Sequence, residues 1–147
     1  MTSILLTLGL ALAAPPDLSA WAKRSNLPLA VPDGGSVQQT ADGLALVGAG
    51  ESLLLSAGEG EAALDAALAS MWAPFVEAGI RAPTVVEEAC TIQGTPAACR
   101  GAKLTVGPGA ELHLLAAQKP GTDWLLVCLD RAIDRPGVCT PYVIRTP

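Results

Sequence analysis

The chain has 147 residues, with nine Lys and Arg against 14 Asp and Glu, a net charge of −5 and half of its residues hydrophobic. This length and composition are typical of one globular domain with its own core, and they exclude a disordered chain. The few basic residues are scattered, whereas binding to a phosphate backbone needs a basic stripe. Nucleic acid is therefore not an expected partner.

The N-terminus has the pattern of an export signal. Residues Ile4–Ala14 are apolar and uncharged, and Ala11-Leu12-Ala13 has the small-x-small pattern that signal peptidase cleaves. We predict a signal peptide over residues 1–13 and a periplasmic or secreted protein. The apolar run has about 11 residues, whereas a membrane span needs roughly 20, so no stable membrane anchor is expected.

After the signal, residues 14–26 form an N-terminal lead-in, either a short helix or extended chain, and residues 27–147 form a single α+β domain. Turn sequences such as Asp42-Gly43 separate short apolar runs in the first half of this domain. Asp-Gly between extended runs is a strong hairpin signal, so this half predicts a β-meander. The expected extended runs are Leu27–Val31, Ser36–Gln39, Leu44–Val47 and Ser52–Ser56.

One amphipathic helix is predicted over Glu61–Gly79. Apolar side chains recur there at intervals of four, three and four residues, and we expect this stripe to face the core. The stripe comprises Leu64, Leu68, Met71 and Phe75, widened by Trp72 and Val76. Pro74 lacks a backbone donor and is expected to kink or divide the helix.

Longer strands are predicted in the second half, over Thr84–Ile92, Ala97–Val106, Glu111–Gln118 and Trp124–Asp130. With residue 117 opposite 124, the last two strands are apolar on both faces, which indicates a sheet covered on both sides. A second layer besides the helix is therefore expected. Residues Val138–Thr146 fit either a final strand or a short helix.

Four cysteines in an exported chain indicate two disulfides. Of the three possible pairings we favour Cys90 with Cys99 and Cys128 with Cys139, because each pair is close in sequence. The first pair brackets the turn Gln93–Pro96, which would place 90 opposite 99 across a hairpin. These spacings do not fit a zinc site.

The order of elements resembles a known superfamily. A Leu-Pro-x-x-Val-Pro-Asp-Gly opening at Leu27–Gly34, a small β-meander, a helix ending in glycine and a meander of longer strands resemble the PsbP-like α/β/α sandwich, which includes bacterial periplasmic proteins of the DcrB type. The resemblance implies a twisted antiparallel sheet between helical layers, and binding or accessory roles rather than catalysis. This chain departs at its C-terminus, where the family usually has a helix and Pro136 and Pro141 occur here. No binding residue is carried over.

Few residues suggest catalysis. His113 is the only histidine, and on an extended strand it shares a face with Glu111. Glu87 and Glu88 are adjacent, so a regular strand directs them to opposite faces. The glycine-rich turns carry Glu51 and Glu59 where a phosphate loop would carry lysine. No metal or other cofactor is expected.

The sequence therefore predicts a non-catalytic binding or accessory domain that acts on another cell-envelope or extracellular protein. One alternative is a carrier of a small hydrophobic ligand, with a cavity between sheet and helix lined by Met71, Phe75, Leu114 and Val127. Another is a hydrolase that uses His113 with a carboxylate.

Overall fold

A computed structural model describes residues 18–41 and 43–146. The predicted signal peptide and its cleavage site lie outside these residues. The helices are α2 (Leu18–Ser25) and α3 (Glu61–Glu77). The strands are β1 (Ser36–Gln39), β2 (Gly43–Gly48), β3 (Glu51–Ala57), β4 (Val86–Ile92), β5 (Thr95–Gly107), β6 (Ala110–Gln118), β7 (Trp124–Asp130) and β8 (Val143–Arg145).

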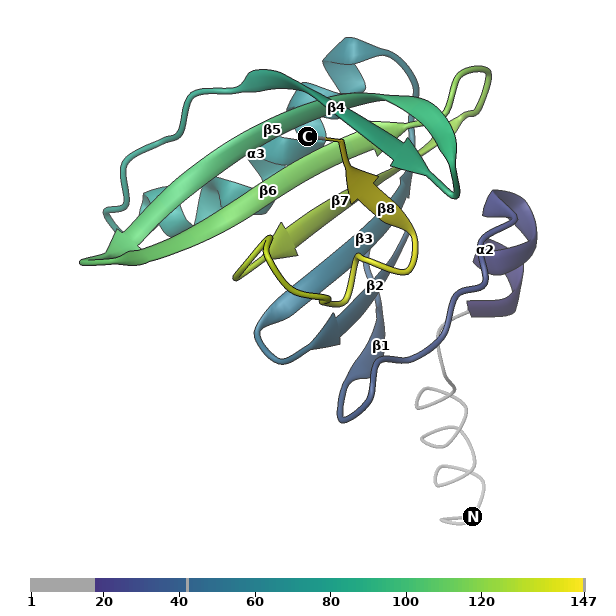
Figure 1. Cartoon of the computed structure of the whole chain (residues 1–147), viewed down its shortest axis with the longest axis horizontal. Helices are drawn as coiled ribbons and strands as arrows, with labels where there is room; N and C mark the ends of the chain where they lie inside the picture. The colour runs from purple at the N-terminus through teal and green to yellow at the C-terminus, as the bar shows by residue number, and fades with distance from the viewer. Residues whose placement is uncertain (1–17, 42, 147) are drawn as a thin grey trace, which may run out of the picture.

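The strands form one antiparallel sheet in the order β1-β2-β3-β7-β6-β5-β4-β8 (Figure 1). Hairpins connect β1 to β2 and β3, and β4 to β5, β6 and β7, as the two predicted meanders require. Pairing of β3 with β7 joins the two meanders into a single sheet. The predicted α+β class, with a twisted antiparallel sheet and one main helix, is confirmed.

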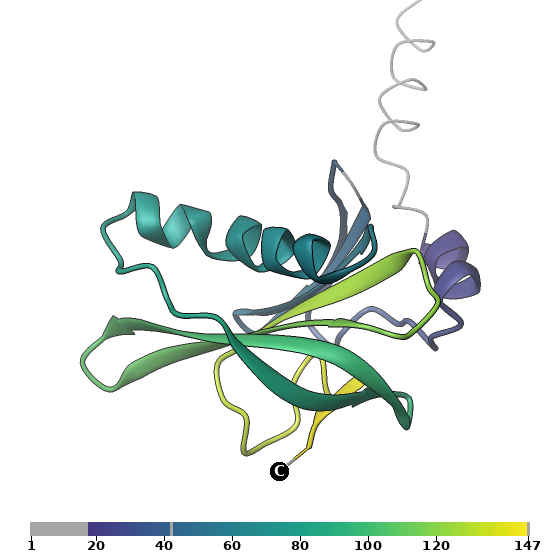
Figure 2. The ribbon, with the colours of Figure 1, turned by 90° about the horizontal axis from the view of Figure 1, so that it is seen from above.

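Helix α3 covers one face of the sheet (Figure 2). Leu64 and Leu68 are fully buried, and Met71, Trp72 and Phe75 pack more loosely against the same cluster, which confirms the core-facing stripe. Pro74 lies inside the helix without dividing it, because a proline near the C-terminal end removes only one of the hydrogen bonds between turns. One detail of the predicted stripe is wrong. Val76 is exposed, since it lies at the margin of the stripe.

The opposite face is also covered, as the two-sided apolar strands predicted. Leu18 and Trp21 of α2 pack on it, which resolves the lead-in as partly helical. The chain after β7 crosses the same face and ends in β8, beside β4. The ambiguous C-terminus is therefore a strand of three residues. Leu27–Val31 is not a strand; it runs across the core without pairing, with Leu27 buried.

Both predicted disulfides are present, Cys90–Cys99 and Cys128–Cys139. The predicted register of the first hairpin is wrong by two residues, because the turn contains only Gln93 and Gly94, both with positive φ. Cys90 is thus opposite Ala97, and the disulfide joins diagonal neighbours with a Cα–Cα distance of 6.0 Å.

The predicted register of β6 and β7 is also shifted by two residues: Ala117 lies opposite Leu126 rather than 124. A register shift of two residues keeps every side chain on the same face of the sheet, so the predicted apolar faces are still correct. The connection between the strands has the predicted bounds, and the Gln118 side chain donates hydrogen bonds to the backbone carbonyls of Thr122 and Trp124 within it.

Candidate binding site

One end of the sheet face that the C-terminal segment crosses is polar. Alternate side chains of a strand share a face. The face that carries Cys90, Leu115 and Cys128 therefore also carries the polar side chains that lie two residues away along each of these strands. In the register, Lys103 lies opposite His113, and His113 lies opposite Asp130. Glu88 follows on the same face of β4. Four neighbouring strands therefore bring polar side chains together at this end of the sheet.

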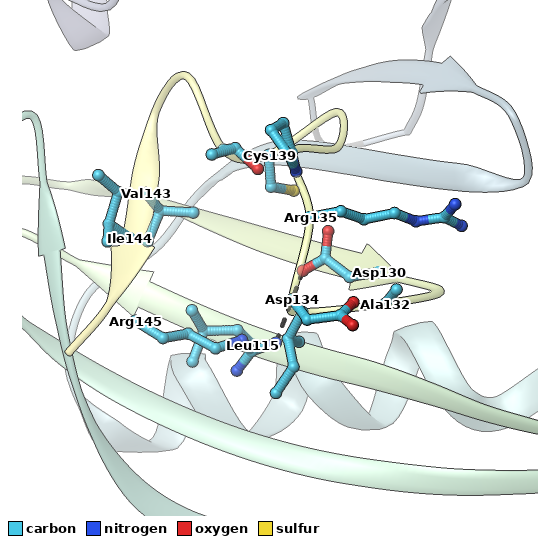
Figure 3. A pocket seen from close by; sticks show the side chains of 12 residues that line it. Leu115, Asp130, Ala132, Asp134, Arg135, Cys139, Val143, Ile144 and Arg145 are labelled. Atoms are coloured by element: carbon cyan, nitrogen blue, oxygen red, sulfur yellow. Dashed lines mark ion pairs between the residues drawn. The ribbon is translucent and has the colours of Figure 1, made fainter. Parts of the chain in front are cut away.

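Arg145 of β8 reaches into this group. Its Nη1 donates to Glu88 Oε1 at 3.0 Å, and its Nη2 lies 3.6 Å from Asp130 Oδ2 (Figure 3). The Nη2 atom is buried and has no hydrogen-bond partner among the residues described. Glu88 also lies over Gly101, where a Cβ atom would overlap its carboxylate. The glycine therefore gives Glu88 room to reach Arg145.

Two hollows adjoin this group. One, of about 490 Å³, is lined by Thr84, Val86, Glu88, Ala102, Lys103, His113, Ile133 and Arg145. The second, of about 290 Å³, lies under the C-terminal segment, where Asp130, Asp134, Arg135 and Thr140 contribute to its lining. Ile133 and Arg145 line both hollows. We call the two together the C-terminal cleft.

Burial changes the acid–base behaviour of two groups in the cleft. Desolvation, opposed by the Arg145 guanidinium and assisted by the Glu51 carboxylate, raises the pKa of Asp130 to about 6. Desolvation also lowers the pKa of His113, with Arg145 acting in the same direction and Glu111 against it. A carboxyl group with a pKa near 6, opposite a histidine, can exchange protons near neutral pH. A hydrolase that uses His113 nevertheless remains only a prediction.

The wall of the cleft is held by Glu51, a buried carboxylate of β3. Its Oε2 accepts the Arg131 N–H at 2.9 Å and its Oε1 accepts the Val138 N–H at 3.1 Å. A Cβ atom at Gly137 would overlap the carboxylate, so the chain passes directly over it. The sequence identified Glu51 only as a residue of a glycine-rich turn, whose carboxylate would repel a phosphate group. Its partners are 80 and 87 residues away, so no local pattern could identify them.

The residues predicted to line a ligand cavity lie elsewhere. Leu114 and Val127 are fully buried, and Met71 and Phe75 pack against the same cluster between α3 and the sheet. None of the four lines the C-terminal cleft. The carrier function is untested and remains a prediction.

The cleft shows no metal-binding geometry. Within residues 18–41 and 43–146, no group of three or more His, Cys, Asp or Glu side chains is arranged to hold a metal ion. None of the helices in these ranges is long and apolar enough to cross a membrane.

Asp130→Asn is expected to stabilise the protein by about 2 kcal/mol at pH 7.5, because asparagine removes the cost of a partly buried charge. The rise in pKa corresponds to about 3 kcal/mol, and solvent screening of the partly exposed carboxylate reduces this value. The folded-state pKa of Asp130 is raised from 3.8 to about 6. The protonated carboxyl group therefore stabilises the folded protein fully below pH 3.8, and this contribution is lost as the pH rises through about 6. The difference between variant and wild type should therefore vanish as the pH falls to 4. Urea unfolding from pH 4 to 8 measures this. Asp134→Asn, at an exposed carboxylate, is the control, and a destabilised Asp130→Asn at pH 7.5 would contradict the argument.

Comparison with known proteins identifies no relative. The chain matches no family model, no curated protein and no solved structure. The resemblance to the PsbP-like superfamily therefore remains a prediction, and the function must be argued from the site.

Proposed function

We propose that this protein is an exported, disulfide-stabilised, non-catalytic binding domain that engages another cell-envelope or extracellular protein through the C-terminal cleft. The two disulfides support an oxidising compartment, where such bonds persist. They also account for all cysteines, so thiol chemistry is not available to the described chain. The resemblance to accessory proteins of the PsbP-like superfamily points to the same class of function.

The observation that carries the proposal is the distribution of exposed hydrophobic side chains. Val86 and Ile133 are 50% and 57% exposed; Val86 lines the larger hollow of the cleft and Ile133 lines both hollows. The partly buried Arg145 lines the same two hollows. Protein interfaces combine apolar contacts with arginine at the centre and a polar rim, and exposed apolar patches mark such surfaces.

Ile133→Asp is expected to weaken partner capture by at least about tenfold, because a charge would be placed in an apolar contact. The test places a photo-cross-linking amino acid at Thr140, which lines the smaller hollow, in the native host, and identifies the adduct by mass spectrometry. The yield of that adduct is then compared between wild type and Ile133→Asp.

Val76→Asp is the matched control, since Val76 is also exposed but lies on α3. Its adduct yield should equal that of the wild type. Equal yields from wild type and Ile133→Asp would show that the cleft is not the binding surface, and the absence of any protein adduct would overturn the binding function.

A further inference from the structure

Strand β4 extends beyond its outer neighbour. β8 pairs only with residues 90–92 of β4, and the last bond on that side is from the Thr146 N–H to the Ala89 carbonyl at 2.8 Å. On its other side β4 pairs with β5 as far as Val86 (Figure 1). The first residues of β4 therefore form an open edge of the sheet.

The hairpin register shows which backbone groups lie on this edge. Ile92 and Thr95 close the two-residue turn, so residues 92, 90, 88 and 86 direct their N–H and C=O groups toward β5. The alternate residues direct theirs outward, as the bond to Ala89 demonstrates. Glu87 is the next outward residue, and its N–H and C=O lie beyond the end of β8. An antiparallel strand placed along this edge would form hydrogen bonds with both the N–H and the C=O of Glu87.

The open edge borders the larger hollow of the C-terminal cleft. Val86 and Ile133 give it aliphatic walls, and Arg145 lies at the boundary between the two hollows. The guanidinium charge is already balanced by Glu88 and Asp130, and its Nη2 atom is buried out of reach of a ligand. Arg145 therefore offers no free counter-ion to a charged ligand, which favours an uncharged segment.

We propose that an extended, uncharged segment of the partner protein adds to the outer edge of β4 at Glu87, antiparallel to it and in line with β8. This rests on the proposed function. A β-branched or leucine side chain of the segment enters the hollow between Val86 and Ile133. Only another extended backbone offers both a donor and an acceptor at strand spacing, which is the basis of recognition by strand addition.

The test is a titration of the ¹⁵N-labelled protein with an acetylated and amidated Thr-Val-Thr-Val-Thr-Val hexapeptide, followed by NMR. Shifts are expected at the amides of Glu87 and Ala89 and at the Arg145 side chain. The same hexapeptide N-methylated at all six residue amides has no backbone N–H left to donate along the strand edge and is expected to cause none. This comparison needs no variant of the protein.

Glu87→Pro removes the outward donor without breaking a β4–β5 hydrogen bond, and Glu87→Ala keeps that donor. The proline variant is expected to bind the hexapeptide about tenfold more weakly than the alanine variant. Equal shifts with the N-methylated peptide, shifts confined to the other sheet edge at β1, or concentration-dependent dimerisation through β4 without peptide binding would each overturn the proposal.

Failure here is distinguishable from failure of the proposed function. If capture of the partner depends on Ile133 but the Glu87→Pro and Glu87→Ala proteins capture it equally, the binding domain stands and strand addition is wrong. If capture is weakened by Glu87→Pro as well, both are supported.

Discussion

Replacement of Cys128 and Cys139 by alanine is expected to lower the free energy of unfolding by about 3 kcal/mol, the chain-entropy value for a loop of this length. Both sulfurs are buried, and the disulfide fixes the segment that crosses the sheet between β7 and β8. Few backbone bonds hold this segment, and Glu51 supplies the other anchor. Its loosening should also weaken partner capture, because the segment forms one wall of the C-terminal cleft.

The double alanine variant of Cys90 and Cys99 is the matched control. That disulfide closes a loop of similar length, so its loss should lower the stability by a similar amount. However, β4 and β5 remain paired along their ladder, and the cleft should keep its shape. Urea unfolding measures stability, and hydrogen exchange at Val143–Arg145 measures loosening of the segment. Equal exchange at these amides in both variants would contradict the assigned role.

Gln118→Leu is expected to destabilise the protein by about 3 kcal/mol, because leucine has nearly the same size but leaves several buried backbone groups without partners. The Gln118 Nε2 donates to the carbonyls of Gly58 and Trp124 at 2.7 and 3.0 Å. Its Oε1 accepts the Gly60 N–H at 2.9 Å, next to the first turn of α3. One side chain thus joins the start of the helix to the β6–β7 connection.

The control is Gln39→Leu on the exposed edge strand β1, which should change the stability by less than about 0.5 kcal/mol. Thermal unfolding of the two variants tests the difference. If both lose the same small amount, water replaces the bonds of Gln118, and the side chain does not hold the helix start.

Local patterns in the sequence were sufficient for the elements and for much of their packing. The spacing of Leu64, Leu68 and Phe75 predicted which face of the helix is buried, and this depends only on helical periodicity. The two-sided apolar pattern of the last long strands predicted that both faces of the sheet are covered. Close spacing along the chain selected the two disulfides. Each of these inferences involves residues within about a dozen positions of one another, where backbone geometry alone limits the possibilities.

Turn geometry was less accessible. The sequence predicted a loop at Gln93–Pro96, but positive φ at Gln93, a residue without special preference for it, shortens the turn to two residues. Which residues open a hairpin depends on small differences in backbone energy. These differences moved Cys90 from its predicted position opposite Cys99 without moving it to the other face.

Only the tertiary structure decided what the cleft contains. The pairing of β3 with β7, the return of the C-terminus to β4 and the anchoring of that return by Glu51 join residues far apart in the sequence. Arg145 meets Glu88 across 57 residues, and no periodicity relates them. The sequence by itself determined helix α3, the strands from β1 to β7, the apolar faces and the disulfide partners, because these follow from local geometry. The open edge of β4 and the polar end of the sheet arise from long-range packing, in which many weak contacts compete and no single local signal records the outcome.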